Sequence, residues 1–126
     1  MARFAPNNFY SNGFNSIRNA AARRIVVLTS EITVYANIAA GTLAATALVD
    51  ANLTEAAGSV SGRRLNVAAF NDISISTSGD ATHVAIVDDD ADVVQYITTC
   101  TTQTLTAAGT VTIPTWGIEV RAPAAP

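Results

Sequence analysis

Hydrophobic and polar residues alternate with a period of two along much of the chain from Arg24 onward, which is the pattern of half-buried β-strands. The continuous aliphatic run Ile25–Leu28 is different, because it predicts a strand that is buried on both faces. The alternation predicts further strands at 32–38, 65–69, 73–75, 84–86, 94–98, 111–113 and 116–120.

Turn-forming residues separate these segments at intervals of roughly 8–12 residues, the spacing typical of antiparallel β-proteins. They include Asn-Asp at 71–72, Ser-Gly-Asp at 78–80, the acidic run 88–92, Ala-Ala-Gly at 107–109 and Pro-Thr at 114–115. Threonine occupies many strand positions, which suits a pleated and partly solvated surface. We therefore predict an all-β domain over residues 23–120, an antiparallel β-sandwich or a barrel-like sheet.

The segment 42–57 fits this pattern less well, because it is rich in Ala and Leu, which favour helices. Its apolar residues do not form a stripe with helical spacing. We expect a strand through Leu43–Val49 and then a short helix or loop at 50–57.

Both ends of the chain lie outside the predicted domain. Residues 1–22 are rich in Asn, Ser, Pro and Gly, so we expect an extended N-terminal arm. Residues 121–126 predict an extended Pro/Ala tail of polyproline type. The arm carries Phe9, Tyr10 and Phe14, which either fold back onto their own domain or contact another subunit, since exposed aromatic residues are unfavourable.

Charge is distributed unevenly between the arm and the rest of the chain. Residues 1–30 hold four Arg and no acid, whereas residues 31–126 hold three Arg and ten acids, so +4 is followed by −7. A basic arm on an acidic body favours contact with another protein or another copy. We therefore predict a homo-oligomer. We predict no nucleic-acid partner, because the pI of about 4.8 is far from that of nucleic-acid-binding domains. The predicted contact residues are Arg3, Phe9, Tyr10, Phe14, Arg18, Arg23 and Arg24.

Composition excludes several classes of protein. The 126 residues suffice for one domain, and 49% hydrophobic with 13% charged residues is the reverse of a disordered chain. One Cys allows no disulfide, and one His with one Cys makes a Cys/His metal site implausible. No apolar run reaches the ~20 residues of a membrane span, and residues 1–14 lack the apolar core of a signal peptide. We expect no membrane association.

The acidic residues Asp88, Asp89, Asp90 and Asp92 form the densest cluster of functional groups. Several converging carboxylates can bind Ca²⁺, but this run lacks the glycine and closing glutamate of an EF-hand. It also joins two predicted strands. The favoured interpretation is a solvated hairpin tip, with a cation site as the alternative.

Other chemically interesting residues have structural interpretations. His83 has no nucleophile motif beside it, and Gly58–Gly62 places Val where a nucleophile elbow needs Ser. Cys100 is expected to be a small buried residue, and Trp116 to be a core residue rather than a sugar-stacking platform. Two pairs of consecutive arginines, at 23–24 and at 63–64, either bind carboxylates at an interface or are ordinary surface residues. We predict no catalytic, cofactor or metal site, and no enzyme.

The C-terminal half contains the motif THVAIVD at 82–88, a Thr-rich strand with TTC at 98–100, and GTVTIP at 109–114 running into a strand with Trp116. In these motifs it resembles small β-rich proteins of tailed bacteriophages and their prophages. The resemblance covers roughly residues 61–120 and contains no catalytic signature. It implies a virion component, and the family supplies no active-site residues.

From the resemblance and the composition together we expect a capsid decoration or cement protein made in the bacterial host cytoplasm and located in the virion. Its expected partners are the major capsid protein or other virion proteins. The alternatives are a receptor- or glycan-binding module of a head or tail fibre, with Trp116 or Tyr96 accessible, and a neck or tail component.

Overall fold

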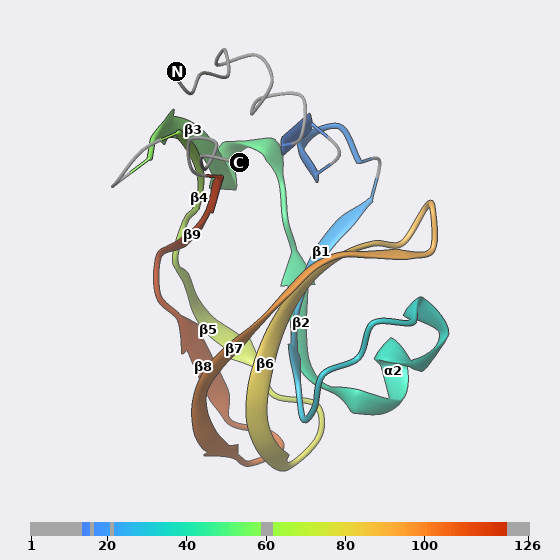
Figure 1. The fold of residues 1–126 in the computed structure, drawn as a ribbon. Helices are drawn as coiled ribbons and strands as arrows, with labels where there is room; N and C mark the ends of the chain where they lie inside the picture. The colour runs from blue at the N-terminus through green and yellow to red at the C-terminus, as the bar shows by residue number, and fades with distance from the viewer. Residues whose placement is uncertain (1–13, 16, 21, 59–61, 121–126) are drawn as a thin grey trace, which may run out of the picture.

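The computed structural model describes residues 14–15, 17–20, 22–58 and 62–120, and it is an antiparallel all-β domain (Figure 1). Three short helical elements interrupt the strands: η1 (Tyr35–Asn37), α2 (Ile38–Gly41) and η2 (Asp50–Asn52). The strands are β1 (Arg23–Leu28), β2 (Thr42–Ala47), β3 (Leu53–Ala57), β4 (Arg63–Val67), β5 (Phe70–Ser74), β6 (Gly79–Asp88), β7 (Val93–Leu105), β8 (Thr110–Ile113) and β9 (Trp116–Val120). The prediction of an all-β fold is confirmed.

The strands form a four-stranded sheet in the order β2-β1-β6-β7, a three-stranded sheet in the order β3-β4-β9, and a two-stranded sheet of β5 and β8. Every pairing is antiparallel. The isolated bridge between Ala44 and Ile75 joins β2 to the segment after β5. The four-stranded sheet is thus linked to the two-stranded sheet at its β2 edge, which gives the sandwich a barrel-like character.

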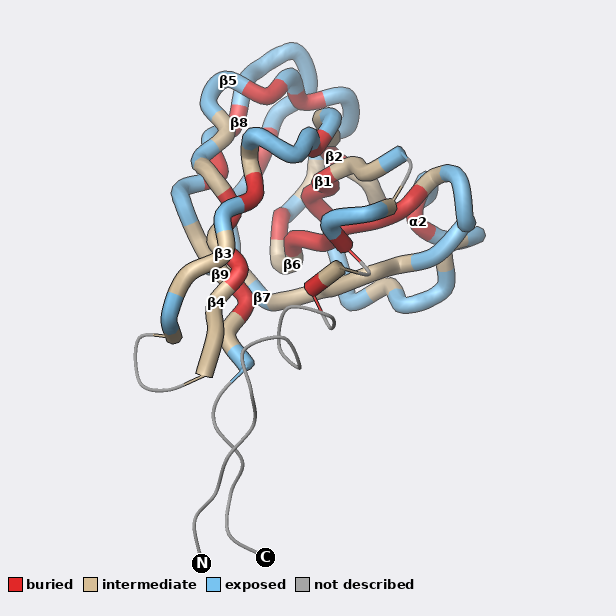
Figure 2. The backbone as a smooth tube through the Cα atoms, turned by 90° about the horizontal axis from the view of Figure 1, so that it is seen from above, coloured by how far each residue is buried: buried red, intermediate tan, exposed pale blue. Residues whose placement is uncertain are grey.

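The main core lies between the four-stranded sheet and the two smaller sheets (Figure 2). Ile25 and Val27 of β1 and Ile86 of β6 face it from one side. Leu65 and Val67 of β4 face it from the other side, and both are completely buried. Alternate residues of each strand therefore supply this core, as a period of two requires.

A second, smaller core covers the opposite face of the four-stranded sheet. It contains Val26 and Leu28 of β1 together with Ala85 and Val87 of β6, and Ile38 of α2 closes it. Because β1 is covered on both faces, all four residues Ile25–Leu28 are buried. This confirms the prediction from its continuous apolar sequence.

The prediction of a strand at 32–38 is wrong. This segment forms a loop, η1 and the start of α2, and only Ile38 of its seven residues is buried. Its alternating apolar residues do not pair with a neighbouring strand. Instead Ile32 and Tyr35 pack against the second core, so tertiary packing overrides the local period of two.

The prediction for 42–57 is correct for a strand, which ends at Ala47 rather than at Val49, and for a short helix after it, but it is wrong for residues 53–57. Residues 42–47 form β2, and Asp50–Asn52 form the short helix η2. Residues 53–57 are not helix or loop but strand β3, which pairs along its full length with β4. The helix propensity of Ala56 and Ala57 is overridden by this pairing with Arg64 and Arg63.

The part of the N-terminal arm that the structure describes is not extended. Residues 14, 15, 17 and 18 are helical, which corrects the prediction for this part of 1–22. Phe14 and Ile17 are three residues apart, so they share one helix face, and both are buried in the main core. Residues 1–13, 16, 21 and the predicted tail 121–126 lie outside the described residues.

The long strand β7 carries two irregularities in its pairing with β6. One extra residue, Gln95, lies between the pairs Ile86–Tyr96 and Val87–Val94, and the register shifts again between the pairs with Ala81 and His83. The predicted strand at 94–98 is therefore present but longer. The predicted turn at 71–72 is instead an irregularity within β5, where Asp72 has a positive φ of 57°.

The turn between β7 and β8 offers a test of backbone strain. Ala108 adopts a positive φ of 70°, which glycine accepts more readily than alanine. We predict that Ala108→Gly raises the free energy of unfolding by about 1 kcal/mol, measured by urea denaturation.

The neighbouring substitution Ala107→Gly provides the matched control. Ala107 lies in the same exposed turn but is not among the residues with positive φ, so Gly there only increases the freedom of the unfolded chain. It should lower stability by about 0.5 kcal/mol. Equal effects of the two substitutions would contradict the assignment of strain to Ala108.

Candidate functional site

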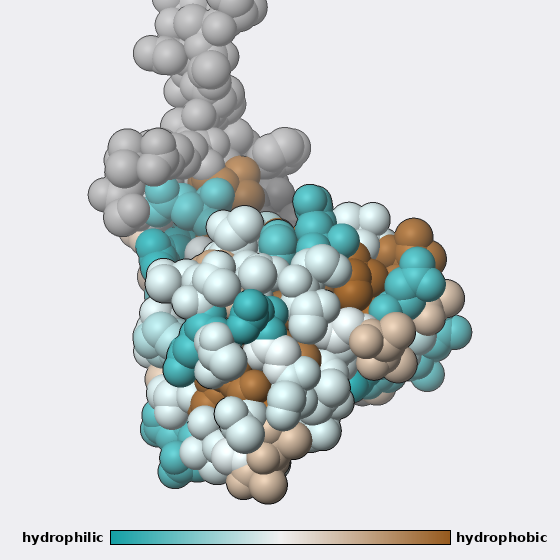
Figure 3. All heavy atoms as spheres, turned by 90° about the horizontal axis from the view of Figure 1, so that it is seen from below, coloured by the Kyte–Doolittle hydropathy of each residue, from teal (hydrophilic) through white to brown (hydrophobic). Residues whose placement is uncertain are grey.

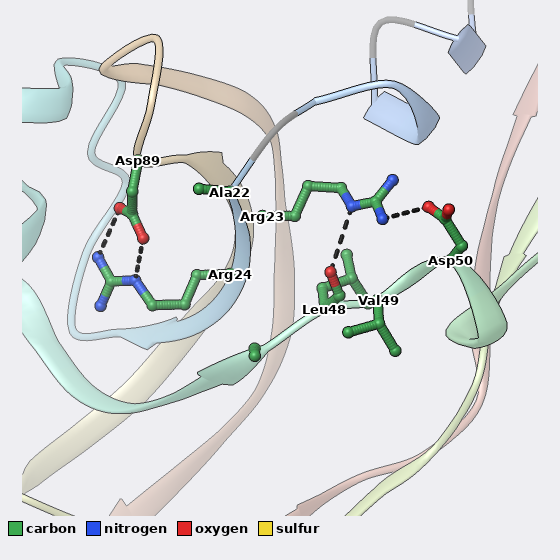
Figure 4. A pocket seen from close by; sticks show the side chains of 8 residues that line it. Ala22, Arg23, Arg24, Leu48, Val49, Asp50 and Asp89 are labelled. Carbon is green, nitrogen blue, oxygen red and sulfur yellow. Dashed lines mark hydrogen bonds and ion pairs between the residues drawn. The ribbon is translucent and has the colours of Figure 1, made fainter.

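A hollow in the described surface lies where β1 begins and β2 ends, and two predicted contact residues line it (Figure 4). Its volume is about 530 Å³. Arg23 and Arg24 contribute to its wall, with Asp50 and Asp89 beside them. The remaining lining residues are Ala22, Ala47, Leu48 and Val49.

Arg23 is a buried guanidinium group that joins three parts of the chain. Its side chain is only 7% exposed. Its Nη1 donates to the carbonyl oxygens of Ile17 (3.1 Å) and Arg18, and its Nε donates to the carbonyl oxygen of Leu48 at 3.2 Å. Its Nη2 pairs with Asp50, whose side chain is 86% exposed. The hydrogen-bonding capacity of Arg23 is therefore used to fix the short N-terminal helix to the end of β2.

Arg24, on the opposite face of the strand, pairs with Asp89 in the β6–β7 turn. The two hydrogen bonds measure 3.0 Å from Nε and 3.2 Å from Nη2, and the Tyr35 hydroxyl donates to the same carboxylate at 2.7 Å. Partial burial raises the pKa of Asp89, but the hydrogen bonds from Arg24 and Tyr35 and the positive charge of Arg24 outweigh it, so the pKa is lowered. The hydrogen bond to Asp89 raises the pKa of Tyr35.

The acidic run 88–92 is a hairpin turn, but only part of it is solvated. Asp88 is 5% exposed, and its Oδ1 accepts hydrogen bonds from the backbone N–H groups of Asp90 (3.0 Å) and Ala22 (3.4 Å). Asp90 and Asp92 are exposed. The expectation of a solvated tip is thus wrong for Asp88, because backbone N–H groups compensate the burial of its carboxylate. Within the described ranges no group of three His, Cys, Asp or Glu side chains is arranged to hold a metal ion.

The structure places the remaining predicted contact residues unequally. Phe14 is 3% exposed and packs in the core of its own domain, as one of the two expectations for the arm aromatics had it. Arg18 is 43% exposed and lies 3.9 Å from Glu55 on β3. Arg3, Phe9 and Tyr10 lie outside the described residues. Contact of these residues with a partner stays a prediction.

The second arginine pair also makes contacts within the chain. Arg63 pairs with Glu55 across β4 and β3 at 2.9 Å. Arg64 donates to Asn66 at 2.6 Å and lies so close to Gly117 on β9 that a side-chain carbon there would meet its guanidinium group.

His83, Cys100 and Trp116 have local structural roles. His83 Nδ1 lies 2.8 Å from the hydroxyl of its neighbour Thr82. Cys100 and Trp116 are half-buried against the main core, and burial raises the pKa of the Cys100 thiol. Trp116 stacks on Tyr96, with a distance of 6.0 Å between the ring centroids.

A second candidate surface is a groove between β7 and the β8–β9 segment. Two hollows of about 280 and 210 Å³ lie along it, and they share Val84, Cys100, Ile113 and Pro114. Thr98, Trp116 and Gly117 line the larger hollow, and none of the residues lining either hollow is charged. We refer to this feature as the β7 groove.

Free strand edges border the β7 groove on both sides. β7 pairs only with β6, β8 only with β5, and β9 only with β4 in the part of the chain that the structure describes. The β7 groove was not predicted from the sequence. The absence of any charge or proline over Val93–Leu105 could have indicated an edge open to a partner, since natural edge strands usually carry such protective residues.

A scan against protein-family models finds no match, and searches of curated proteins and of solved structures find no similar protein. In the described residues no helix is long and apolar enough to cross a membrane.

We predict that Arg23→Ala lowers the free energy of unfolding by about 3 kcal/mol, because it removes three hydrogen bonds to backbone carbonyls that each contribute about 1 kcal/mol. Asp50→Ala is the control. Its carboxylate is largely exposed, so its loss should cost less than about 1 kcal/mol. Chemical denaturation of both variants measures the difference, and equal losses would show that the ion pair, rather than the carbonyl contacts, gives Arg23 its importance.

A second prediction concerns acid. Because the pKa of Asp89 is lower in the folded chain, its ionised form contributes stability above the unfolded value of about 4, and that contribution disappears as the pH falls through the folded pKa. Asp89→Asn should lower stability at pH 7 and flatten the decline below about pH 4, measured by denaturation as a function of pH.

Tyr35→Phe distinguishes the contributions of Arg24 and Tyr35, the two side chains that donate hydrogen bonds to Asp89. It removes the hydroxyl but leaves both bonds from Arg24, so it should preserve most of the acid dependence. An unchanged decline in the Asp89→Asn variant would assign the acid sensitivity to other carboxylates.

Proposed function

We propose that the chain is a non-enzymatic structural protein of a bacteriophage virion, a capsid decoration protein that stabilises the shell through contacts between subunits. The observation that carries the proposal is the unpaired edge of β7 beside an uncharged groove. Sheet edges with free N–H and C=O groups are surfaces on which another chain can add a strand.

The surface chemistry supports association with protein rather than with a charged ligand. The exposed and half-buried positions of β7 are Val, Gln, Tyr, Ile, Thr and Cys, without a charged residue. Figure 3 shows a face in which most residues have intermediate hydropathy, with only small strongly hydrophilic or hydrophobic areas. Such a surface loses less hydration energy than a charged one when a partner covers it, and backbone hydrogen bonds can then provide affinity.

The position of the virion resemblance adds support. It covers roughly residues 61–120, which include β6, β7, β8 and β9 and therefore all the strands that border the β7 groove. A protein that binds only the assembled shell stabilises that shell by mass action, without catalysis.

A glycan-binding function has less support. It predicts an accessible aromatic platform, whereas Trp116 and Tyr96 are both half-buried and stack on each other. Stacking occupies one face of each ring, which reduces the aromatic surface that a sugar could use. The geometry thus favours a protein partner over a carbohydrate.

The first test is a quantitative protein inventory of purified particles of the phage or prophage that encodes the chain. We expect hundreds of copies in each particle. A few copies would indicate a fibre or neck component and overturn the decoration role, and complete absence would overturn the virion role.

A binding test addresses the surface. Thr98→Asp introduces a charge into the β7 groove and should reduce binding of the purified chain to particles that lack it by at least tenfold. Thr33→Asp is the matched control, because it introduces the same charge at an exposed loop position that does not line the groove. Equal binding by both variants would exclude the groove as the contact surface.

A further inference from the structure

The two long sides of the sandwich differ in how they are closed. On one side, where β2 and β3 are the edge strands, Arg23 joins the N-terminal helix to the carbonyl oxygen of Leu48, and Arg18 lies beside Glu55 of β3. The bridge between Ala44 and Ile75 closes the lower part of that side. On the opposite side, no strand pairing joins β7 to β8 or β9 in the described residues.

On this open side, no strand bridges the gap in backbone pairing between β7 and the β8–β9 segment. The floor of the β7 groove consists of main-core residues, among them Val27, Ala81 and Val84. Val84 and Val111 are among the most exposed members of this core, at 7% and 8%. An extended segment in the groove would cover them.

The free edge of β7 offers backbone groups to an extended segment in the groove. Between the two irregularities of β7, the regular stretch Tyr96–Thr99 can pair with such a chain.

The chemistry of the occupant follows from the lining. The groove has no charged lining residue, so it suits an uncharged extended segment with apolar side chains and hydrogen-bonding amides. Residues 4–13 of this chain, FAPNNFYSNG, have this composition, with three aromatic residues and three asparagines. Arg3 precedes them and gives this end of the chain a positive charge opposite to that of the acidic body.

We infer that the β7 groove binds residues 4–13 of a second copy of this chain. The described chain begins at Phe14, on the side formed by β2 and β3, whereas the groove lies on the side formed by β7 and β9. The first described residue of the chain and the groove are therefore on opposite sides of one copy. The contacts inferred between copies are heterologous, and we expect closed rings or open chains from them.

This inference rests on the proposed function only for its biological setting, since it concerns purified chains in solution. Cys100 lines the groove and is the only cysteine, so it can report on the occupant. In the full chain, Asn8→Cys places a second thiol within the inferred donor segment. Mild oxidation should then produce disulfide-linked multimers larger than dimers, seen on non-reducing gels.

Control variants distinguish the other occupants. Wild-type chain should stay unlinked, because dimers joined through Cys100 would indicate pairing of two β7 edges instead. Asn8→Cys combined with Cys100→Ser should give dimers at most. An internally linked monomer of the Asn8→Cys variant would show that each chain fills its own groove, and the absence of any link to Cys100 would overturn the inference.

A competition experiment uses the only tryptophan. A synthetic peptide of residues 1–13, added to the full chain, should change the fluorescence of Trp116 and dissociate the multimers. A peptide with Phe9→Ala and Tyr10→Ala should bind at least tenfold more weakly. If neither peptide has an effect, the inference fails, and the virion inventory remains an independent test of the proposed function.

Discussion

The Arg23 guanidinium group is the interaction on which the arrangement of this domain depends. It lies at the start of the strand that occupies the centre of both cores, and it satisfies carbonyl groups of the N-terminal helix and of the chain leaving β2. A lysine could not replace it, because a single ammonium group lacks the rigid fork of donors that reaches acceptors in several directions. Through this contact Phe14 and Ile17 are held in the main core, and the side formed by β2 and β3 is closed.

Arg24, the next residue of the same strand, likewise connects separate segments on the outer face of the sheet. Arg24 holds the β6–β7 turn through Asp89, and Tyr35 brings the η1–α2 segment to the same carboxylate. Two consecutive arginines thus organise two different layers, since successive strand residues point to opposite faces. Neither arginine contacts the groove-facing edge of β7, so we assign the contacts with other chains to that edge.

Sequence periodicity predicted the fold class because alternate residues of a strand face the core, so burial of one face imposes a period of two. It succeeded for Ile25–Leu28, where both faces are covered, and for 111–113 and 116–120. It failed at 32–38, where Ile38 packs onto a sheet face instead of pairing in a ladder, and at Leu53–Ala57, where pairing with β4 outweighs helix propensity. The partners of Arg23 could not be predicted, because they are backbone carbonyls whose positions depend on the complete fold.

The position of β1 has a consequence for how the domain opens. β1 is hydrogen-bonded on both sides and covered on both faces, whereas β7 is bonded on one side and interrupted by two irregularities. Amide hydrogens should therefore exchange slowest in β1 and progressively faster toward β7, since local opening needs less free energy where fewer contacts break. The domain thus has a gradient of local stability across one sheet, from a rigid central strand to a more easily opened edge strand, the one to which we assign contacts with other chains.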